Sequence, residues 1–266
     1  MRDERLLVYQ MGRVGSKTIE YSLKAIGLLP YHVHTLSDKG LSYYKDMLSK
    51  SEEGSQQFKK YHNKLKEIEH LRIQIKQGKG KWKVITLTRD PVARNISFFF
   101  YYFFNLQAKS RFNLDAKNLE GLLSLFLKSP SLDGFNTHET PLLWFDVEMK
   151  AVFGIDVYKT KFPFHKGYEI YNGEKADVLL IRLEDLARCY QQAFKEFLSI
   201  ESFKLINKNI ASTGLYSSIY EQFCKNVVLP EEYVDKMYNS RYVRHFYTEE
   251  EIDFFRRKWS GIIQLV

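Results

Sequence analysis

Residues 12–18, GRVGSKT, place two glycines beside two basic side chains. A strict phosphate-binding P-loop has the form G-x-x-x-x-G-K-[ST], with Gly directly before Lys, whereas Ser16 separates Gly15 from Lys17 in this chain. The free backbone N–H groups of such a turn, and the positive end of the helix dipole behind it, favour phosphate or sulfate. We therefore predict an anion site here, to which Arg13 and Lys17 add charge.

A second stretch with anion-binding character is TLTRDPVARNISFFFYYF, at residues 86–103. Arg89 ends an apolar run that predicts a buried strand, Pro91 suits the first turn of a helix, and Ser97 comes eight residues after Arg89. Ligands of open α/β sheets bind beyond the carboxyl ends of the strands, so we expect Arg89 and the 12–18 loop to open onto one crevice. Two anion sites on one crevice predict a ligand with phosphates at two ends.

Short apolar runs predict the strands that position these residues, at 6–10, 31–35, 83–88 and 178–182. Helical spacing follows the strong strands, as in Ile19, Leu23 and Ile26 after the first of them. This alternation is typical of a parallel sheet covered by helices. We predict one α/β domain over residues 1–266. Its helical regions are expected at 115–151 and 184–261, with a buried aromatic helix at 96–106.

Residues 38–80 interrupt the alternation with a polar segment that has helical spacing. Between residues 37 and 83 there are 12 Lys and Arg against 6 Asp and Glu, in a chain whose net charge is +8. We interpret this segment as a basic helical insert between two strands. A basic surface attracts nucleic acid, acidic glycans, anionic lipids or a polyphosphorylated cofactor. A solvated, lysine-rich helical hairpin is the alternative.

The remaining composition limits the cellular setting and the kind of site. The two cysteines, Cys189 and Cys224, are too few and too isolated for a disulfide framework or a zinc site, and they predict free thiols in a reducing compartment. The first residues, MRDERLLVYQMG, lack the apolar core of a signal peptide, and no apolar run is long enough to span a membrane. We predict a cytoplasmic protein without stable membrane insertion.

The two loop motifs together resemble those of sulfotransferases that use 3'-phosphoadenosine 5'-phosphosulfate (PAPS). The resemblance implies a three-layer P-loop-like fold with a central, mostly parallel sheet flanked by helices. It assigns the 5'-phosphosulfate to the first motif (Gly12, Arg13, Val14, Gly15, Ser16, Lys17 and Thr18). Arg13 falls where the family has its catalytic Lys or Arg, Lys17 joins it in catalysis, and the 3'-phosphate goes to Arg89 and Ser97.

The resemblance is closer to enzymes that modify glycans. YHVH at residues 31–34 is similar to the Tyr-His-Gly-His stretch of heparan sulfate 2-O-sulfotransferase, which implies that His34 is the general base and His32 its neighbour. Residues 144–158 and 181–186 look similar to bacterial capsular-polysaccharide sulfotransferases. RKWS at 257–260 resembles, incompletely, that family's Asn-Lys-Trp-Tyr-Ser signature. The implied acceptor is a glycan, acidic or neutral, and not a nucleic acid.

Sulfuryl transfer requires charge stabilisation on the departing phosphate and removal of a proton from a sugar hydroxyl. Arg13, Lys17 and the loop N–H groups suit the first task, and a histidine suits the second. We take His32 and His34 to lie on opposite faces of their strand, so that one faces the crevice and the other is structural. The scheme requires no metal ion, and the sequence shows no convincing metal cluster.

Four histidine and arginine positions elsewhere are weaker candidates. Arg241 and Arg244 lie in a basic stretch before a predicted helix, where family members often close a loop over the nucleotide, and a surface turn is the alternative. His138 and His165 are expected in solvated loops.

Two rival functions remain at this stage. A P-loop kinase would need a Mg²⁺-holding Asp at a strand end, for which this region offers only Asp90, and the Lys spacing of the loop is broken. A basic binding protein for glycan or nucleic acid would rely on the insert, and its binding would weaken steeply with salt.

Overall fold

The computed structural model describes residues 5–102, 118–128, 137–206 and 217–262. The chain forms two compact units, each built from two segments. Unit 1 comprises Met1–Thr88 and Leu143–Ile206, and unit 2 comprises Arg89–Leu142 and Asn207–Val266. We describe each unit by itself, and the single domain expected from the sequence stays a prediction.

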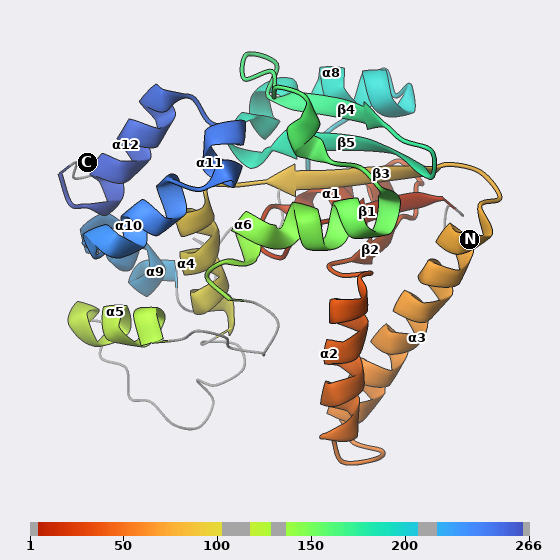
Figure 1. Cartoon of the computed structure of the whole chain (residues 1–266), viewed down its shortest axis with the longest axis horizontal. Helices are drawn as coiled ribbons and strands as arrows, with labels where there is room; N and C mark the ends of the chain where they lie inside the picture. The colour runs from red at the N-terminus through yellow and green to blue at the C-terminus, as the bar shows by residue number, and fades with distance from the viewer. Residues whose placement is uncertain (1–4, 103–117, 129–136, 207–216, 263–266) are drawn as a thin grey trace. The chain divides into compact units, whose positions relative to one another are not determined.

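Unit 1 contains a five-stranded sheet with the order β2-β1-β3-β5-β4 (Figure 1). The strands are β1 (Leu6–Tyr9), β2 (Tyr31–Val33), β3 (Trp82–Thr88), β4 (Tyr168–Asn172) and β5 (Ala176–Arg182). β1 pairs in parallel with β2 and β3, β3 pairs in parallel with β5, and β4 is antiparallel to β5. The mixed α/β class and the mostly parallel sheet are thus confirmed, and the antiparallel edge strand β4 was not predicted.

The strands form where the apolar residues run continuously. All four residues of β1 are buried, as are six of the seven in β3. Burial on both faces is typical of parallel strands that helices cover. β2 is shorter than the strand predicted at 31–35. It ends at Val33, and His34 and Thr35 lie beyond it.

Helices cover both faces of this sheet. α1 (Ser16–Ala25) packs on the face of β2 that carries His32. In α8 (Leu186–Leu198), the ring centroid of Phe197 lies 4.9 Å from Nζ of Lys83 on β3. On the opposite face, Tyr9 of β1 meets Trp144 and Phe153, which belong to a continuous helical segment. That segment consists of α6 (Thr140–Trp144), the π-helical turn η2 (Phe145–Lys150) and α7 (Ala151–Phe153). Two short 3-10 turns, η3 (Val157–Lys159) and η4 (Leu183–Asp185), complete the unit.

Residue Ile26 corrects the predicted apolar face of the first helix. α1 ends at Ala25, and Ile26 is 41% exposed, whereas Ile19 and Leu23 are fully buried. The helix stops one residue before the apolar spacing does, because Gly27 follows with a left-handed backbone (φ 84°).

The basic insert is helical, as predicted, and its two helices form a hairpin. α2 (Asp38–Ser49) begins at the N-cap Ser37, and α3 (Gln56–Gln77) begins at the N-cap Ser55. Figure 1 shows the two helices packed along each other and extending away from the sheet. The base of α3 is held by a buried apolar stripe, Leu65, Ile68, Leu71 and Ile75. The hairpin is therefore part of the core of unit 1 at one end and solvated at the other.

Unit 2 is helical within its described residues. It contains α4 (Pro91–Tyr102), α5 (Leu119–Lys128), α9 (Ser217–Asn226), α10 (Glu231–Tyr238), α11 (Arg241–Phe246) and α12 (Glu249–Trp259). Phe99 and Phe100 of α4 pack edge-to-face on Phe126 and Phe223, which confirms their core role. Tyr101 is 44% exposed, so the helix is not buried all round, and 103–106 lie outside the described residues. Thr248 followed three residues later by Glu251 predicts a capping box at the start of α12, and the reciprocal hydrogen bonds of these two residues confirm it.

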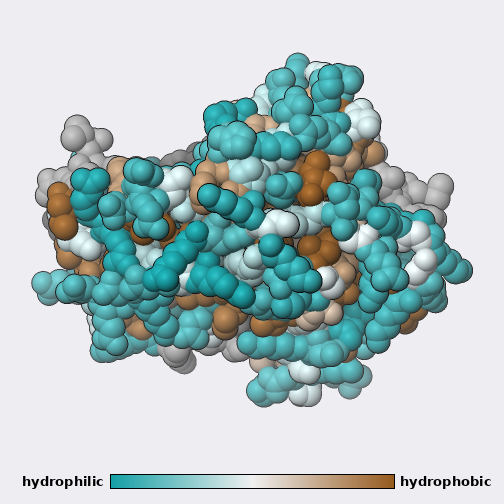
Figure 2. All heavy atoms as spheres, turned by 45° about the horizontal axis from the view of Figure 1, so that its top comes forward, coloured by the Kyte–Doolittle hydropathy of each residue, from teal (hydrophilic) through white to brown (hydrophobic). Residues whose placement is uncertain are grey.

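Hydrophilic side chains predominate on the face drawn in Figure 2, with apolar residues in scattered patches. Within the described ranges, no helix has both the length and the apolar character needed to cross a lipid bilayer.

Candidate anion and histidine site

The predicted anion loop joins β1 to α1. Gly15 is the N-cap of α1 and has a left-handed backbone (φ 91°), and Arg13 is also left-handed (φ 73°). The first residue of the helix, Ser16, is buried, and so is Val14, whereas Arg13 and Lys17 are half-buried. Because the first N–H groups of a helix lack intrahelical partners, this turn has the local form of an anion site.

Gly15 is needed for a second reason, which is close packing. A Cβ atom at this position would lie 2.8 Å from Cδ1 of Leu183 and 3.6 Å from Cδ2 of Leu87. Leu87 belongs to β3, and Leu183 directly follows β5. The loop therefore rests on the carboxyl ends of two neighbouring strands, and Leu183 contributes to the site by supporting it.

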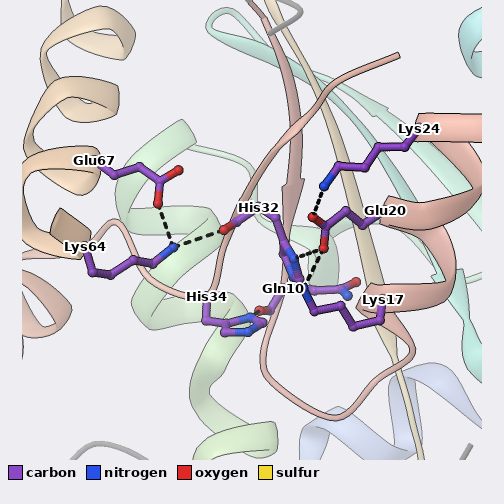
Figure 3. Close-up of polar contacts among 8 residues, drawn as sticks. All are labelled: Gln10, Lys17, Glu20, Lys24, His32, His34, Lys64 and Glu67. Atoms are coloured by element: carbon purple, nitrogen blue, oxygen red, sulfur yellow. Dashed lines mark hydrogen bonds and ion pairs between the residues drawn. The ribbon is translucent and has the colours of Figure 1, made fainter. Parts of the chain in front are cut away.

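The face of α1 next to the loop carries a carboxylate that sequence reasoning missed, Glu20. Its Oε2 atom accepts from Lys17 Nζ at 2.9 Å and lies 2.7 Å from Nδ1 of His32, and its Oε1 accepts from Lys24 Nζ at 2.6 Å (Figure 3). The pKa of Glu20 is lowered, chiefly by the hydrogen bond with His32 and next by those with Lys24 and Lys17, against the opposing effect of burial. The spacing of Glu20 from Lys17 and Lys24, three and four residues, is the sequence signal that could have found this cluster.

The predicted opposite orientation of the two histidines is wrong. The rings of His32 and His34 lie on the same side, with centroids 5.0 Å apart and planes at 84°. Residues two apart along an extended chain share a face, so the two side chains leave the sheet in the same direction. The structure thus brings both histidines to one place instead of assigning one of them to the crevice.

His34 is held in one tautomer by the backbone. Its Nδ1 lies 2.8 Å from the carbonyl oxygen of Gln10, an atom that can only accept, so Nδ1 carries the proton and Nε2 the lone pair. Burial lowers the pKa of His34 to about 3, helped by the nearby charges of His32, Lys64 and Lys17, and opposed by the bond to Gln10. His34 is therefore neutral at physiological pH and accepts a proton weakly.

Two polar groups next to these histidines have no hydrogen-bond partner among the residues that the structure describes. They are Nε2 of His32 and both amide atoms of Gln10, a residue with 0% exposure. Gln10 directly follows β1 and lies two residues after Val8, the register partner of His32, so the Gln10 and His32 side chains are on the same face of the sheet (Figure 3). Buried polar groups are normally satisfied, so these atoms mark the site as one that is completed by something else.

The segment that carries the histidines is held from two further elements. Glu148 of η2, with 0% exposure, accepts from the hydroxyls of Tyr9, Thr35 and Ser37 and from the N–H groups of Leu36 and Ser37. From α3 of the hairpin, Lys64 donates to the carbonyl of His32 at 3.1 Å and Arg72 to that of Leu36 at 2.6 Å. The basic insert therefore also positions the histidine segment, which its sequence alone did not reveal.

The second predicted motif lies in unit 2. Arg89 is half-buried, and its backbone N–H and C=O both bond with the hydroxyl of Tyr242, at 3.1 and 2.8 Å. Pro91 opens α4 as predicted, and Ser97, which lies further along the same helix, is 3% exposed. The expectation that Arg89 and Ser97 share a crevice with the 12–18 loop stays a prediction.

The weaker candidates are placed as follows. Arg241 and Arg244 are exposed, but they belong to the short helix α11 and not to the loop that was expected. His138 is not solvated: its Nδ1 lies 2.9 Å from the hydroxyl of Tyr233 and its Nε2 3.0 Å from the carbonyl of Phe126. His165 is exposed, as expected. Cys189 and Cys224 are free thiols, the first buried and the second half-buried.

Metal binding was tested by the same geometry. In the described part of the chain, no group of three or more His, Cys, Asp or Glu side chains is arranged to hold a metal ion. The cluster at Glu20 contains lysines in place of further metal ligands.

The fold and the site define an open, mostly parallel α/β sheet with a glycine-containing loop between its first strand and first helix. Residues 133–248 match the model of the NKWYS family, described as "Putative capsular polysaccharide synthesis protein". The match covers somewhat less than half of the chain and relates it to capsular polysaccharide synthesis. The matched range contains Glu148, β4, β5 and α8. It contains neither the 12–18 loop nor His32 and His34, and RKWS at 257–260 lies beyond it. No curated protein and no solved structure matches the chain.

Proposed function

We propose that this protein is a sulfotransferase that moves a sulfuryl group from PAPS to a hydroxyl of a capsular or other surface polysaccharide in the cytoplasm. The observation that carries the proposal is the loop after β1. It combines a helix N-terminus, a left-handed Gly15, two basic side chains and a pair of histidines on the same face of the sheet. The family match supports the polysaccharide part of the proposal, and the resemblance of the two motifs supports the donor and the P-loop-like fold.

The residues at the loop fit an anionic donor. PAPS supplies the sulfuryl group, which passes to the acceptor oxygen as the bond between sulfur and the 5'-phosphate oxygen breaks. Arg13, Lys17 and the first N–H groups of α1 bind that phosphate and stabilise its charge as it leaves, an effect of ~3 kcal/mol for a typical donor. A histidine of the His32 and His34 pair takes the proton of the acceptor hydroxyl.

The proposal assigns the 3'-phosphate to Arg89 and Ser97, with Arg241 and Arg244 as further contacts to the nucleotide. Charge-assisted contacts with Arg suit a phosphate, because the guanidinium presents two parallel N–H donors. An Arg89→Ala variant therefore weakens nucleotide binding more than it slows the transfer step.

The experiment combines binding and turnover. Thermal shift should show that the product PAP stabilises the protein without Mg²⁺, and ³⁵S-labelled PAPS should label one member of a panel of acidic and neutral oligosaccharides. Arg13→Ala should abolish labelling while the far-ultraviolet circular dichroism stays unchanged. Greater stabilisation by ATP with Mg²⁺ than by PAP would establish the kinase alternative. Salt-sensitive glycan binding that survives Arg13→Ala, without labelling, would establish the binding-protein alternative.

A further inference from the structure

The proposed reaction leaves open which histidine takes the proton, and the contacts around Glu20 distinguish the two. Nδ1 of His32 lies 2.7 Å from a carboxylate oxygen of Glu20, whereas Nδ1 of His34 faces the neutral carbonyl of Gln10. A carboxylate behind an imidazole fixes its tautomer and stabilises the imidazolium that forms when the ring accepts a proton. A carbonyl fixes the tautomer but offers no charge.

The free atoms next to His32 have the pattern of a hydroxyl-binding group. With its Nδ1 proton directed at Glu20, His32 presents the lone pair of Nε2, which has no partner in the described part of the chain. The amide of Gln10, likewise without a described partner, offers an N–H donor. A hydroxyl can donate to the first and accept from the second, so one ligand group satisfies both.

Lys17 links this group to the anion loop. Its ammonium and the His32 ring share the same oxygen of Glu20, Oε2, at 2.9 and 2.7 Å (Figure 3). The Lys17 side chain is 44% exposed, and an ion pair this exposed is easily exchanged. When Lys17 turns towards a bound anion, Oε2 of Glu20 is left to His32 alone.

We propose that Gln10, His32 and Glu20 form the acceptor-hydroxyl subsite, in which His32 is the catalytic base, Glu20 the residue that positions it, and Gln10 the donor that orients the hydroxyl. This assignment rests on the proposed sulfuryl transfer and differs from the one that the family resemblance implies. The acceptor O–H bond breaks, its proton and no electrons pass to His32 Nε2, and the acceptor oxygen uses the freed electron pair to bond to sulfur. The His34 ring packs edge-to-face against the His32 ring and remains neutral.

The kinetic test compares four single variants of the full chain, at Glu20, His32, Lys24 and His34, with labelled PAPS and the acceptor found above. Glu20→Gln keeps the size of the side chain and removes its charge, so kcat should fall by ~10²-fold, within the range for general-base catalysis, while PAP affinity stays within about twofold. His32→Gln should lose at least as much. Lys24→Gln is the matched control, because it removes another partner of Glu20 without touching His32, and its kcat should stay within about twofold of the wild type.

A Glu20→Gln variant that keeps its kcat would overturn the assignment, and so would a loss confined to His34→Gln. Nitrogen-15 NMR of histidine-labelled wild-type protein gives a readout that does not depend on turnover. It should show that the neutral form of the His32 ring carries its proton on Nδ1, the nitrogen that faces Glu20, and a neutral ring with the proton on Nε2 would overturn the subsite. If PAP fails to bind and no acceptor is labelled, the proposed function fails. The NMR measurement then tests the His32 and Glu20 contact separately, because it reports which ring nitrogen of His32 carries the proton.

Discussion

Two carboxylates in unit 1, Glu20 and Glu148, show how differently one sheet uses its two faces. Glu20 lies on α1 with three partners that carry or can carry positive charge, two of them lysines whose side chains are more than 40% exposed. Glu148 lies on the opposite face, fully buried, and all five of its described donors are uncharged hydroxyl or N–H groups. The first cluster can rearrange its charges, and the second cannot.

The surroundings of each carboxylate follow the same division. Around Glu148 every hydroxyl is directed inwards, and burial raises the pKa of Tyr9 well above its usual value, so that this hydroxyl remains a donor. Around Glu20, Gln10 and His32 keep polar atoms without a described partner. A fully satisfied buried network makes a structure rigid, whereas an incomplete one leaves polar atoms that water or a ligand can satisfy. The comparison teaches that the π-helical turn is the support, and it favours our proposal that the α1 face is the working surface.

The largest expected effect tests the supporting role of Glu148. Glu148→Ala should lower the free energy of unfolding by ~3–5 kcal/mol, because it leaves five buried donors without an acceptor. Urea denaturation measures this loss. Glu20→Gln is the control, and its loss should be smaller, since two of its three partners are lysines whose side chains are more than 40% exposed. Equal losses in the two variants would contradict the division between support and working surface.

The second prediction concerns the pH dependence of stability. His34 has a folded pKa of about 3, below the ~6.5 of an unfolded histidine, so the unfolded chain binds the proton first as the pH falls. Stability is therefore complete above ~6.5 and is lost towards pH 3, by at most ~1.4 kcal/mol per pH unit from this group. His138, whose pKa burial also lowers, acts in the same sense.

The lowered pKa of Glu20 adds a loss only when the pH falls below the usual carboxyl range, so the interval from pH 6.5 to 5 isolates the histidines. Thermal melts of His34→Gln across this interval should show a flatter slope than those of the wild type. An unchanged slope would show that the His34 ring is more solvated than its contacts indicate.

A smaller effect is expected from Gly15→Ala in the loop. The left-handed backbone and the 2.8 Å approach of Leu183 both oppose a Cβ atom, so we expect a loss of ~1–3 kcal/mol and weaker PAP binding. Gly12→Ala is the matched control for stability, because no atom lies within 4 Å of the added Cβ. Chemical denaturation of both variants measures the difference, and equal stability would argue against strain in the loop.

The smallest effect is predicted for Lys24→Gln. Its ammonium bonds to Oε1 of Glu20 at 2.6 Å, but the side chain is 43% exposed, and an exposed ion pair contributes ~0–1 kcal/mol. The melting temperature should change by about 3 °C or less. A larger change would mean that the Glu20 cluster is itself part of the support, and the comparison with Glu148 would fail.

The sequence predicted the parts of the fold that depend on local patterns. Continuous apolar runs located β1, β3 and β5, and helical spacing located α1 and the α2–α3 hairpin. β4 was missed because its sequence, YEIYN, is half-polar. The strand lies at the edge of the sheet, where its side chains are only partly buried and a continuous apolar run is not required. Thr248 and Glu251 gave the start of α12 directly, since a capping box involves residues only three apart.

The site was predicted in part. GRVGSKT and the two histidines were found, because glycine and basic residues after a strand carry a local signal. Glu148 and Arg72 were not found, since their bonds to residues 35–38 span more than 30 positions of the chain. The shared face of His32 and His34 follows from the period of an extended strand, and the structure corrected our prediction on this point.

The sequence by itself determined which residues form the anion loop and which strand precedes it, because backbone conformation there depends on neighbours along the chain. Only the tertiary structure decided that Glu20 faces His32 and not solvent, that the basic hairpin holds the histidine segment, and that Gln10 is buried without a described partner. These features arise where α1, β2 and α3 pack together. Long-range packing sets burial and the distance between charges, and these two quantities determine whether a histidine is basic enough to remove a proton.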